Sequence, residues 1–174
     1  FTGEGSISWP FGASRGFDLV VEHPPTRSTR SRKECDASAN RLVLWLQERA
    51  GAPCFLFWHV YEPHAPYLDR RFVGLPVTLP PGVAADATED WQRYLGDLAA
   101  ADAALGRILQ AIDDLGLRET TDVVVISDHG EEFGEHSKGV RSDRTRHGHA
   151  LWDTLLHVPL VVVSPRVPPG RRDD

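Results

Sequence analysis

The sequence DVVVISDHGEEFGEH occupies residues 122–136 and sets the expected fold of the chain. Residues 122–127 form a short β-branched apolar run, which predicts a strand buried on both faces, as in a parallel sheet. Asp128 and His129 follow directly, at the carboxyl end of this strand, where open α/β sheets bind their ligands. A carboxylate beside an imidazole suits a divalent cation, so Asp128 and His129 are candidate metal ligands. The alternative is that Asp128 caps the next segment and that His129 is a surface loop residue.

The rest of the chain alternates predicted helices with predicted strands. Apolar residues at three- and four-residue spacings predict helices over residues 36–50 and 88–115. Residues 54–61 and 158–163 are short apolar runs of the kind that form buried strands. This alternation predicts an α/β fold, layered α/β/α, with a mainly parallel sheet.

Composition and charge exclude several classes of protein. The chain has 174 residues, enough for one domain with a sizeable core, and its formal net charge of -6 argues against nonspecific nucleic-acid binding. No apolar run reaches the ~18 residues of a membrane helix. The two cysteines, Cys35 and Cys54, do not make a disulfide framework. The chain contains no Met, so we expect a processed chain or a piece of a longer protein, and its compartment stays open.

His64 and His147 lie where they can join the candidate metal ligands. His64 follows the strand predicted over residues 54–61, and His147 precedes the one predicted over residues 158–163. Since parallel strands end at one edge of a sheet, we expect the polar side chains of Asp128, His129 and His64 to converge there. His147 reaches the same edge from its loop. Such a group suits metal-assisted hydrolysis, in which a cation stabilises an oxyanion and an imidazole protonates a leaving group.

Other histidines and acids are given structural roles. His59 lies inside a predicted strand and is interpreted as a packed core histidine, and His136 as a solvated or structural residue. Glu131 and Glu132 are interpreted as loop acids rather than ligands. The sequence contains neither a Gly-x-x-x-x-Gly-Lys phosphate loop nor a His-Glu-x-x-His zinc helix, which argues against kinases and zinc proteases.

Three segments carry a resemblance to one enzyme family. The run SDHGEEFGEH at residues 127–136 resembles the segment that closes the metal site in the sulfatase family of the alkaline phosphatase superfamily. The run FWHVYEPHAPY at residues 57–67 is similar to the family segment ending Asp-Pro-His-x-Pro-Tyr, with Glu62 in place of the commoner Asp. The His-Gly pair at residue 147, ahead of Leu-Trp-Asp and Val-Pro-Leu runs, resembles the family's Lys-Gly or His-Gly segment. The Lys-Gly pair at residue 138 is the alternative alignment.

The resemblance implies a role for each matched residue. Asp128 and His129 would bind one divalent cation, which in this family is usually calcium, with manganese or magnesium as alternatives. His64 would face the sulfate ester and donate a proton to the leaving alcohol. His147 would contact the charged oxygens of the substrate, or Lys138 would do so in the other alignment. The substrate would be a small-molecule or glycan sulfate ester.

The resemblance also shows what these residues lack. The family's nucleophile is a formylglycine made from Cys or Ser in a Cys/Ser-x-Pro-x-Arg segment, and neither Cys35 nor Cys54 fits this pattern. The family's adjacent pair of metal-binding aspartates is absent as well. We therefore expect residues 1–174 to be the middle to later part of a sulfatase-like catalytic domain, with the formylglycine upstream, and to be inactive on their own.

Two alternatives to a sulfuric ester hydrolase stay open. The first is a phosphoryl or phosphonate ester hydrolase, or a phosphoglycerol transferase, of the same superfamily, because an Asp-His metal pair is common to both branches. The second is a noncatalytic metal-binding relic domain, which the missing nucleophile favours. The sequence names neither the alcohol of the ester nor the oligomeric state.

Overall fold

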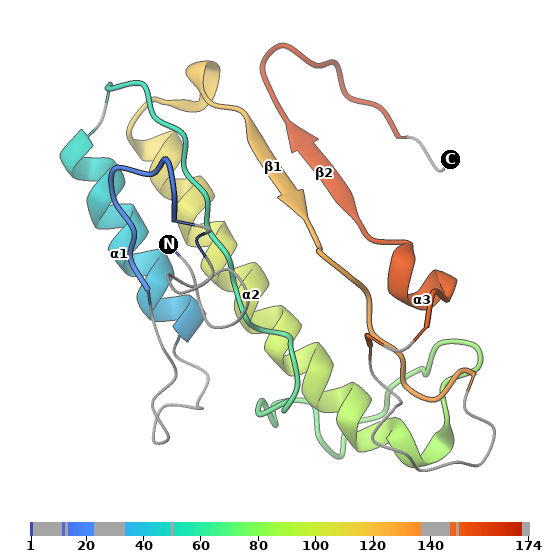
Figure 1. Cartoon of the computed structure of the whole chain (residues 1–174). Helices are drawn as coiled ribbons and strands as arrows, with labels where there is room; N and C mark the ends of the chain where they lie inside the picture. Colours follow the sequence, from blue (N-terminus) through green and yellow to red (C-terminus); the bar gives the residue numbers. More distant parts are fainter. Residues whose placement is uncertain are drawn as a thin grey trace. The chain divides into compact units, whose positions relative to one another are not determined.

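The computed structural model describes residues 1, 12, 14–22, 34–49, 51–136, 147–148 and 150–171. It contains both predicted long helices (Figure 1). It also contains a strand within each of the runs at residues 122–127 and 158–163. The helices and strands, in chain order, are α1 Glu34–Arg49, α2 Thr88–Asp114, β1 Val123–Ile126, α3 Asp153–Leu156 and β2 Leu160–Val163, with short 3-10 turns at Ala85–Ala87 and Arg118–Thr120. None of the helices in these ranges is long and apolar enough to span a membrane.

The chain divides into two compact units. Unit 1 contains Phe1–Leu75 and Gln92–Leu115, and unit 2 contains Pro76–Trp91 and Gly116–Asp174. Most of α2 belongs to unit 1, whereas its first turn belongs to unit 2. That residues 1–174 are one partial catalytic domain stays a prediction.

The core of unit 1 is built from the apolar stripes of α1 and α2. On α1 the buried residues recur every three or four positions, as expected for one face of a helix. On α2 the buried face combines three alanines and two isoleucines with Gly96 and the polar Gln92 and Asp97. An ion pair between Arg107 and Asp36, with a nitrogen-to-oxygen distance of 2.6 Å, joins the two helices. The core residues on the two helices are Cys35, Ala39, Leu42, Leu46, Ala100, Ala104, Ile108, Ala111 and Ile112.

The strand predicted over residues 54–61 is not formed. The segment is extended, and its backbone exchanges two hydrogen bonds with Phe1, at Phe57 and His59. Within the described ranges, these two hydrogen bonds are not continued into a ladder of hydrogen bonds along the segment. A strand exists only when a neighbour satisfies its backbone groups along its length, so the apolar run alone was not enough to make one.

The sheet of unit 2 has two antiparallel strands, and a mainly parallel sheet is not confirmed. Val123 pairs with Val163 and Ile126 with Leu160, and the arrows in Figure 1 point in opposite directions. The reason lies in α3. Leu155 on this helix accepts a hydrogen bond from Gly130, so α3 is fixed close to the end of β1. β2 therefore starts beside that end and runs back along β1.

The burial of β1 also differs from the prediction of a strand covered on both faces. Val123 and Val125 are half-buried, whereas Val124 and Ile126 are exposed. Such alternation is typical of a strand in an antiparallel sheet with one covered face. All four residues of β2 are exposed in this chain. The apolar character of these runs predicted strands correctly but overstated how much of each is covered.

Candidate functional site

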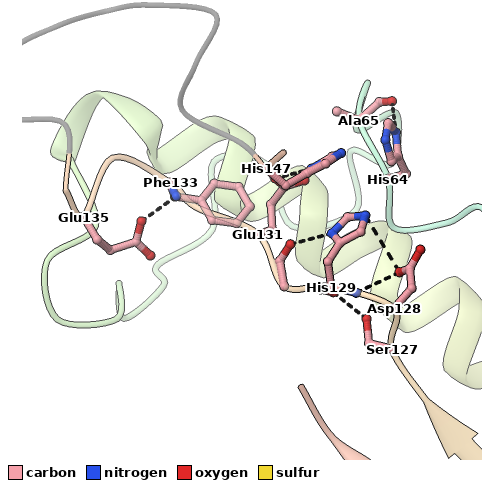
Figure 2. A network of polar contacts seen from close by, with 10 residues as sticks. His64, Ala65, Ser127, Asp128, His129, Glu131, Phe133, Glu135 and His147 are labelled. Carbon is pink, nitrogen blue, oxygen red and sulfur yellow. Dashed lines mark hydrogen bonds and ion pairs between the residues drawn. The ribbon is translucent and has the colours of Figure 1, made fainter. Parts of the chain in front are cut away.

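The turn at residues 127–131, which we call the His129 turn, carries the two candidate metal ligands. It begins where β1 ends, and its own polar groups close it (Figure 2). The Ser127 hydroxyl donates to the carbonyl oxygen of His129 at 2.6 Å, and the backbone N–H of His129 donates to Asp128 Oδ1 at 3.0 Å. The Asp128 side chain is 77% exposed, so its second carboxylate oxygen is open to solvent or to an ion.

The imidazole of His129 is oriented by its own backbone. Its Nδ1 lies 2.7 Å from the carbonyl oxygen of Gly130, and since a carbonyl only accepts, Nδ1 carries the proton. The lone pair is then on Nε2, which lies 3.8 Å from Asp128 Oδ1. Two atoms at this separation fit as ligands of one cation, since metal–oxygen and metal–nitrogen distances are about 2.0–2.6 Å. Asp128 and His129 therefore form a suitable pair of ligands for a divalent ion.

The pair is not a complete coordination shell. Within the ranges that the structure describes, no group of three or more His, Cys, Asp or Glu side chains is placed to hold a metal ion. A divalent cation such as calcium takes six or more ligands. Further ligands would have to come from groups other than these two side chains.

His147 lies against the His129 turn, as the sequence predicted. Its ring stacks on the His129 ring, with 4.1 Å between the ring centroids and 27° between the planes. Its Nδ1 is 2.9 Å from Glu131 Oε1, so the carboxylate accepts a hydrogen bond from Nδ1 and orients the ring (Figure 2). The structure thus brings together Asp128, His129 and His147, all in unit 2.

Glu131 is a site residue that sequence reasoning missed. It lies in a loop, as expected, but its side chain is only 7% exposed and it orients His147. Glu132 lies in the same loop; it is fully buried and accepts a hydrogen bond from the backbone N–H of His136 at 2.9 Å. The sequence signal was weak, because both acids lie in a charged stretch where solvation is the usual outcome.

Gly130 has a steric role that ties the His129 turn to α3. Its N–H donates to the carbonyl oxygen of Leu155 at 2.8 Å. A Cβ at residue 130 would lie 2.0 Å from the carbonyl oxygen of Thr154 and 3.2 Å from Leu155 Cα. These are backbone atoms, so a larger residue at position 130 would have to displace the helix.

His64 lies in unit 1, on a turn at residues 61–67 that we call the His64 turn. Its Nδ1 donates to the carbonyl oxygen of Ala65 at 2.6 Å, which fixes the orientation of the ring (Figure 2). Its backbone N–H donates to the carbonyl of Tyr61 at 2.7 Å, and the Tyr61 and His64 rings lie 4.4 Å apart. Glu62 fixes the start of the turn by accepting a hydrogen bond from the N–H of Cys35 on α1.

The segment after the His64 turn is bound to α2 by side chains. Asp97 accepts hydrogen bonds from the backbone N–H groups of Leu68 and Asp69, both at 3.0 Å. The Asp69 carboxylate, 2% exposed as a residue, in turn binds the Arg71 guanidinium through two nitrogens. Gln92 binds the backbone of residues 74 and 75.

Two groups around the His64 turn have shifted pKa values. Burial, together with the nearby Glu62 and Asp36 charges, raises the pKa of the Cys35 thiol to about 12. Burial also raises the pKa of Asp97, and the hydrogen bonds from Leu68 and Asp69 counteract this only in part. The Cys35 thiol therefore stays protonated near neutral pH and is a poor nucleophile.

Lys138, the alternative substrate contact, lies outside the described residues. His64 belongs to unit 1, and the His129 turn belongs to unit 2. The roles of Asp128, His129, His64, His147 and Lys138 stay predictions.

The family model and the relatives that match this chain belong to one family. The family model described as Sulfatase matches residues 6–174. Steryl-sulfatase of Mus musculus is 30% identical over 167 residues, which cover 88% of this chain and 23% of the relative. Arylsulfatase K of Xenopus laevis is 37% identical over 79 residues, which cover 45% of this chain and 13% of the relative. The chain thus spans less than a quarter of either relative.

A solved structure shares the fold of this chain. It comes from work on the metabolism of multiple glycosaminoglycans by Bacteroides thetaiotaomicron, and the match has a TM-score of 0.60 at 22% sequence identity. It covers 75% of this chain and 29% of the solved chain. At this level of identity the likeness shows the fold alone.

Proposed function

This chain belongs to the sulfatase family, and we propose that it forms part of a catalytic domain that hydrolyses sulfate esters with one divalent cation. The observation that carries the proposal is the His129 turn, where Asp128 and the Nε2 of His129 face one another at 3.8 Å beside His147. The chain covers only part of its relatives, so the activity belongs to the larger protein. The layered, mainly parallel sheet is proposed for that larger domain.

Asp128 and His129 would hold the cation. Calcium is the ion we expect, because it is the usual ion in this family; manganese and magnesium are alternatives, since a carboxylate suits all three ions. When bound, the ion supplies positive charge that stabilises the developing negative charge on the ester oxygens. The exposed Asp128 carboxylate and the oriented His129 ring support this assignment.

His64 is the proposed proton donor to the leaving alcohol. Because its Nδ1 donates to the Ala65 carbonyl, its other nitrogen is the atom that would carry the transferred proton. The ring is held by the adjacent backbone and by the Tyr61 ring, so a proton on Nε2 would be presented in a fixed direction. The leaving alkoxide would take this proton as its bond to sulfur breaks.

His147 is the proposed contact to the charged oxygens of the sulfate. Glu131 accepts the hydrogen bond from Nδ1, so Nε2, when it carries a proton, is the atom that would donate to a sulfate oxygen. Lys138 is the alternative for this role, since a lysine ammonium would bind an anionic oxygen as a point charge.

The nucleophile is proposed to be a formylglycine outside residues 1–174. Cys35 is a poor candidate, because it is buried and its pKa is raised to about 12. The substrate is proposed to be a small-molecule or glycan sulfate ester, as the family membership suggests. A phosphate or phosphonate ester remains the alternative substrate.

The test is a comparison of metal binding and turnover in the intact protein that carries this sequence. We expect hydrolysis of an aryl sulfate, loss of activity with a chelator, and recovery on addition of calcium or manganese. Asp128→Ala is expected to lower metal affinity and kcat/KM by about 100-fold or more, since losing a ligand costs more than losing its hydrogen-bonding partner. The matched control is Asp122→Ala, which removes a carboxylate from an exposed ion pair with Arg166.

Three outcomes would contradict the proposal. Activity and metal affinity of Asp128→Ala within about twofold of the parent would exclude this residue as a ligand. Hydrolysis of the matching aryl phosphate, with the sulfate left intact, would move the protein to the phosphoryl branch. Metal binding without hydrolysis of either ester would favour the noncatalytic domain.

A further inference from the structure

Trp152 is an exposed aromatic residue whose ring is backed by another ring. The residue is 45% exposed, and its neighbour Leu151 is 81% exposed. The His136 ring lies parallel to the indole, with 4.4 Å between the centroids and 9° between the planes. His136 therefore covers one face of the indole, while Trp152 keeps a large exposed area. We call the stacked pair the Trp152 platform.

The platform is rigidly supported on both sides. His136 is held by Glu132, a fully buried carboxylate that accepts its backbone N–H at 2.9 Å and lies 3.5 Å from its Nδ1. The backbone of Trp152 is fixed by α3, because its carbonyl oxygen accepts hydrogen bonds from Leu155 and Leu156. A ring held in this way presents a flat surface without losing much side-chain entropy when a ligand binds.

The platform is also tied to the candidate metal ligands, within unit 2. Trp152 directly precedes α3, and Leu155 on this helix accepts the hydrogen bond from Gly130, the residue after His129. Trp152 and Leu155 are separated by about one helical turn, or ~5 Å along the helix axis. The Trp152 platform and the His129 turn are therefore fixed to one short backbone element.

We propose that the Trp152 platform is a substrate subsite that binds a ring of the alcohol part of the ester. The proposal rests on the proposed function, because it assumes that the His129 turn holds the ester group. A partly exposed indole suits a flat ring with an apolar face, which is the shared chemistry of an aryl group and of the C–H face of a pyranose. Ring-bearing esters would then be preferred over ring-free ones.

Binding is tested first by NMR, independently of turnover. Residues 1–174 contain five tryptophans, so in the intact protein the indole N–H signal of Trp152 is assigned by its loss in Trp152→Phe. Phenol, methyl β-galactopyranoside and sodium methyl sulfate are then titrated separately. We expect the Trp152 signal to move with one or both ring compounds and not with methyl sulfate. Phenol alone indicates an aryl subsite, and the galactoside alone a sugar subsite. No movement with either ring compound would overturn the proposal, whether or not the protein hydrolyses sulfate esters.

Kinetics on the intact protein then test the effect on specificity. Trp152→Ala should lower kcat/KM for phenyl sulfate about threefold to tenfold relative to methyl sulfate, which corresponds to the energy of one ring contact. Trp152→Phe should retain most of the preference. The Trp152 side chain makes no capping hydrogen bond to α3, so its removal leaves the cap unchanged. The matched control is Leu151→Ala, which removes a more exposed apolar side chain without a ring face. An equal loss in Leu151→Ala and Trp152→Ala would overturn the proposal.

Discussion

The His64 turn and the His129 turn orient their imidazole rings in the same way but are anchored differently. In both, Nδ1 of the histidine donates to the carbonyl oxygen of the next residue, at 2.6 Å and 2.7 Å. The chain that follows the His64 turn is then attached to α2 by side chains, chiefly Asp97. The His129 turn is attached to α3 by backbone contacts at Gly130. Side chains can adjust by rotation whereas backbone cannot, so the two turns should differ in their tolerance of change.

Gly130→Ala should have the largest effect on the stability of the protein. The new Cβ would meet the carbonyl oxygen of Thr154 at 2.0 Å, a contact that only a shift of α3 can relieve. We expect a loss of about 3 kcal/mol in the free energy of unfolding, at the upper end of the usual cost of overpacking. Urea unfolding followed by circular dichroism measures it.

The matched control for this prediction is Gly106→Ala on α2. A Cβ at residue 106 would meet none of the described atoms within 4 Å, so Ala should stabilise the helix by up to about 1 kcal/mol. Equal stabilities of Gly130→Ala and Gly106→Ala would show that the contact between the His129 turn and α3 is not rigid.

Gly96→Ala tests the side-chain anchor of unit 1 and should have a smaller effect. Its Cβ would lie 2.6 Å from Asp69 Cβ and 2.9 Å from Asp69 Oδ1, so the Asp69 side chain would have to move away from Arg71. The overpacking cost is offset in part by the better helix propensity of Ala, which leaves a net loss of about 1–2 kcal/mol.

Cys35 provides a local measurement for the same variant. Its thiol is buried beside Glu62, at the start of the His64 turn, and its pKa is about 12, so it should react slowly with a thiol reagent while exposed Cys54 reacts first. Gly96→Ala should speed labelling of Cys35 because the segment is loosened. Gly130→Ala, measured under conditions where it is fully folded, should leave the labelling rate of Cys35 unchanged. The reverse order of labelling rates would refute the assignment of Asp69 and Asp97 to the anchoring of this turn.

Local patterns in the sequence predicted much of this structure. The spacing of apolar residues located α1 and α2 to within two residues of their observed ends, because a helix is stabilised by contacts between residues three and four positions apart. The polar residues after β1 located the His129 turn, because its hydrogen bonds connect neighbours in the chain. The order of the predicted strands placed His147 at the same edge, and its ring stacks on the His129 ring.

Features that depend on distant partners were not predictable in this way. Glu131 is a site residue only because His147, 16 residues later, returns to it, and Asp97 is buried only because residues 68 and 69 donate to it. The segment at residues 54–61 has the composition of a strand, but no strand pairs with it in the part of the chain that the structure describes. The direction of β2 was set by the hydrogen bond between Gly130 and Leu155, which no periodicity in the sequence reveals.

The smallest predicted effect is a pH dependence that comes from the anchor of unit 1. Burial raises the pKa of Asp97 above its ordinary value of 3.8, so the folded protein binds a proton there more tightly than the unfolded chain does. The contribution of Asp97 to stability is then fully present below pH 3.8 and is lost as pH rises through the raised pKa.

Asp97→Asn should remove this dependence of stability on pH. It should also lower the free energy of unfolding by about 1 kcal/mol at every pH, because the amide nitrogen cannot accept the second backbone N–H. The stability difference between the parent and Asp97→Asn should therefore be largest near pH 3.5 and shrink toward neutral pH, where the buried charge weighs against the parent. Urea unfolding across this pH range measures it, with Asp102→Asn as the matched loss of an exposed carboxylate on the same helix. A difference that grows as pH rises would mean that the hydrogen bonds from Leu68 and Asp69 outweigh burial, and that the charged carboxylate is the form that anchors the His64 turn.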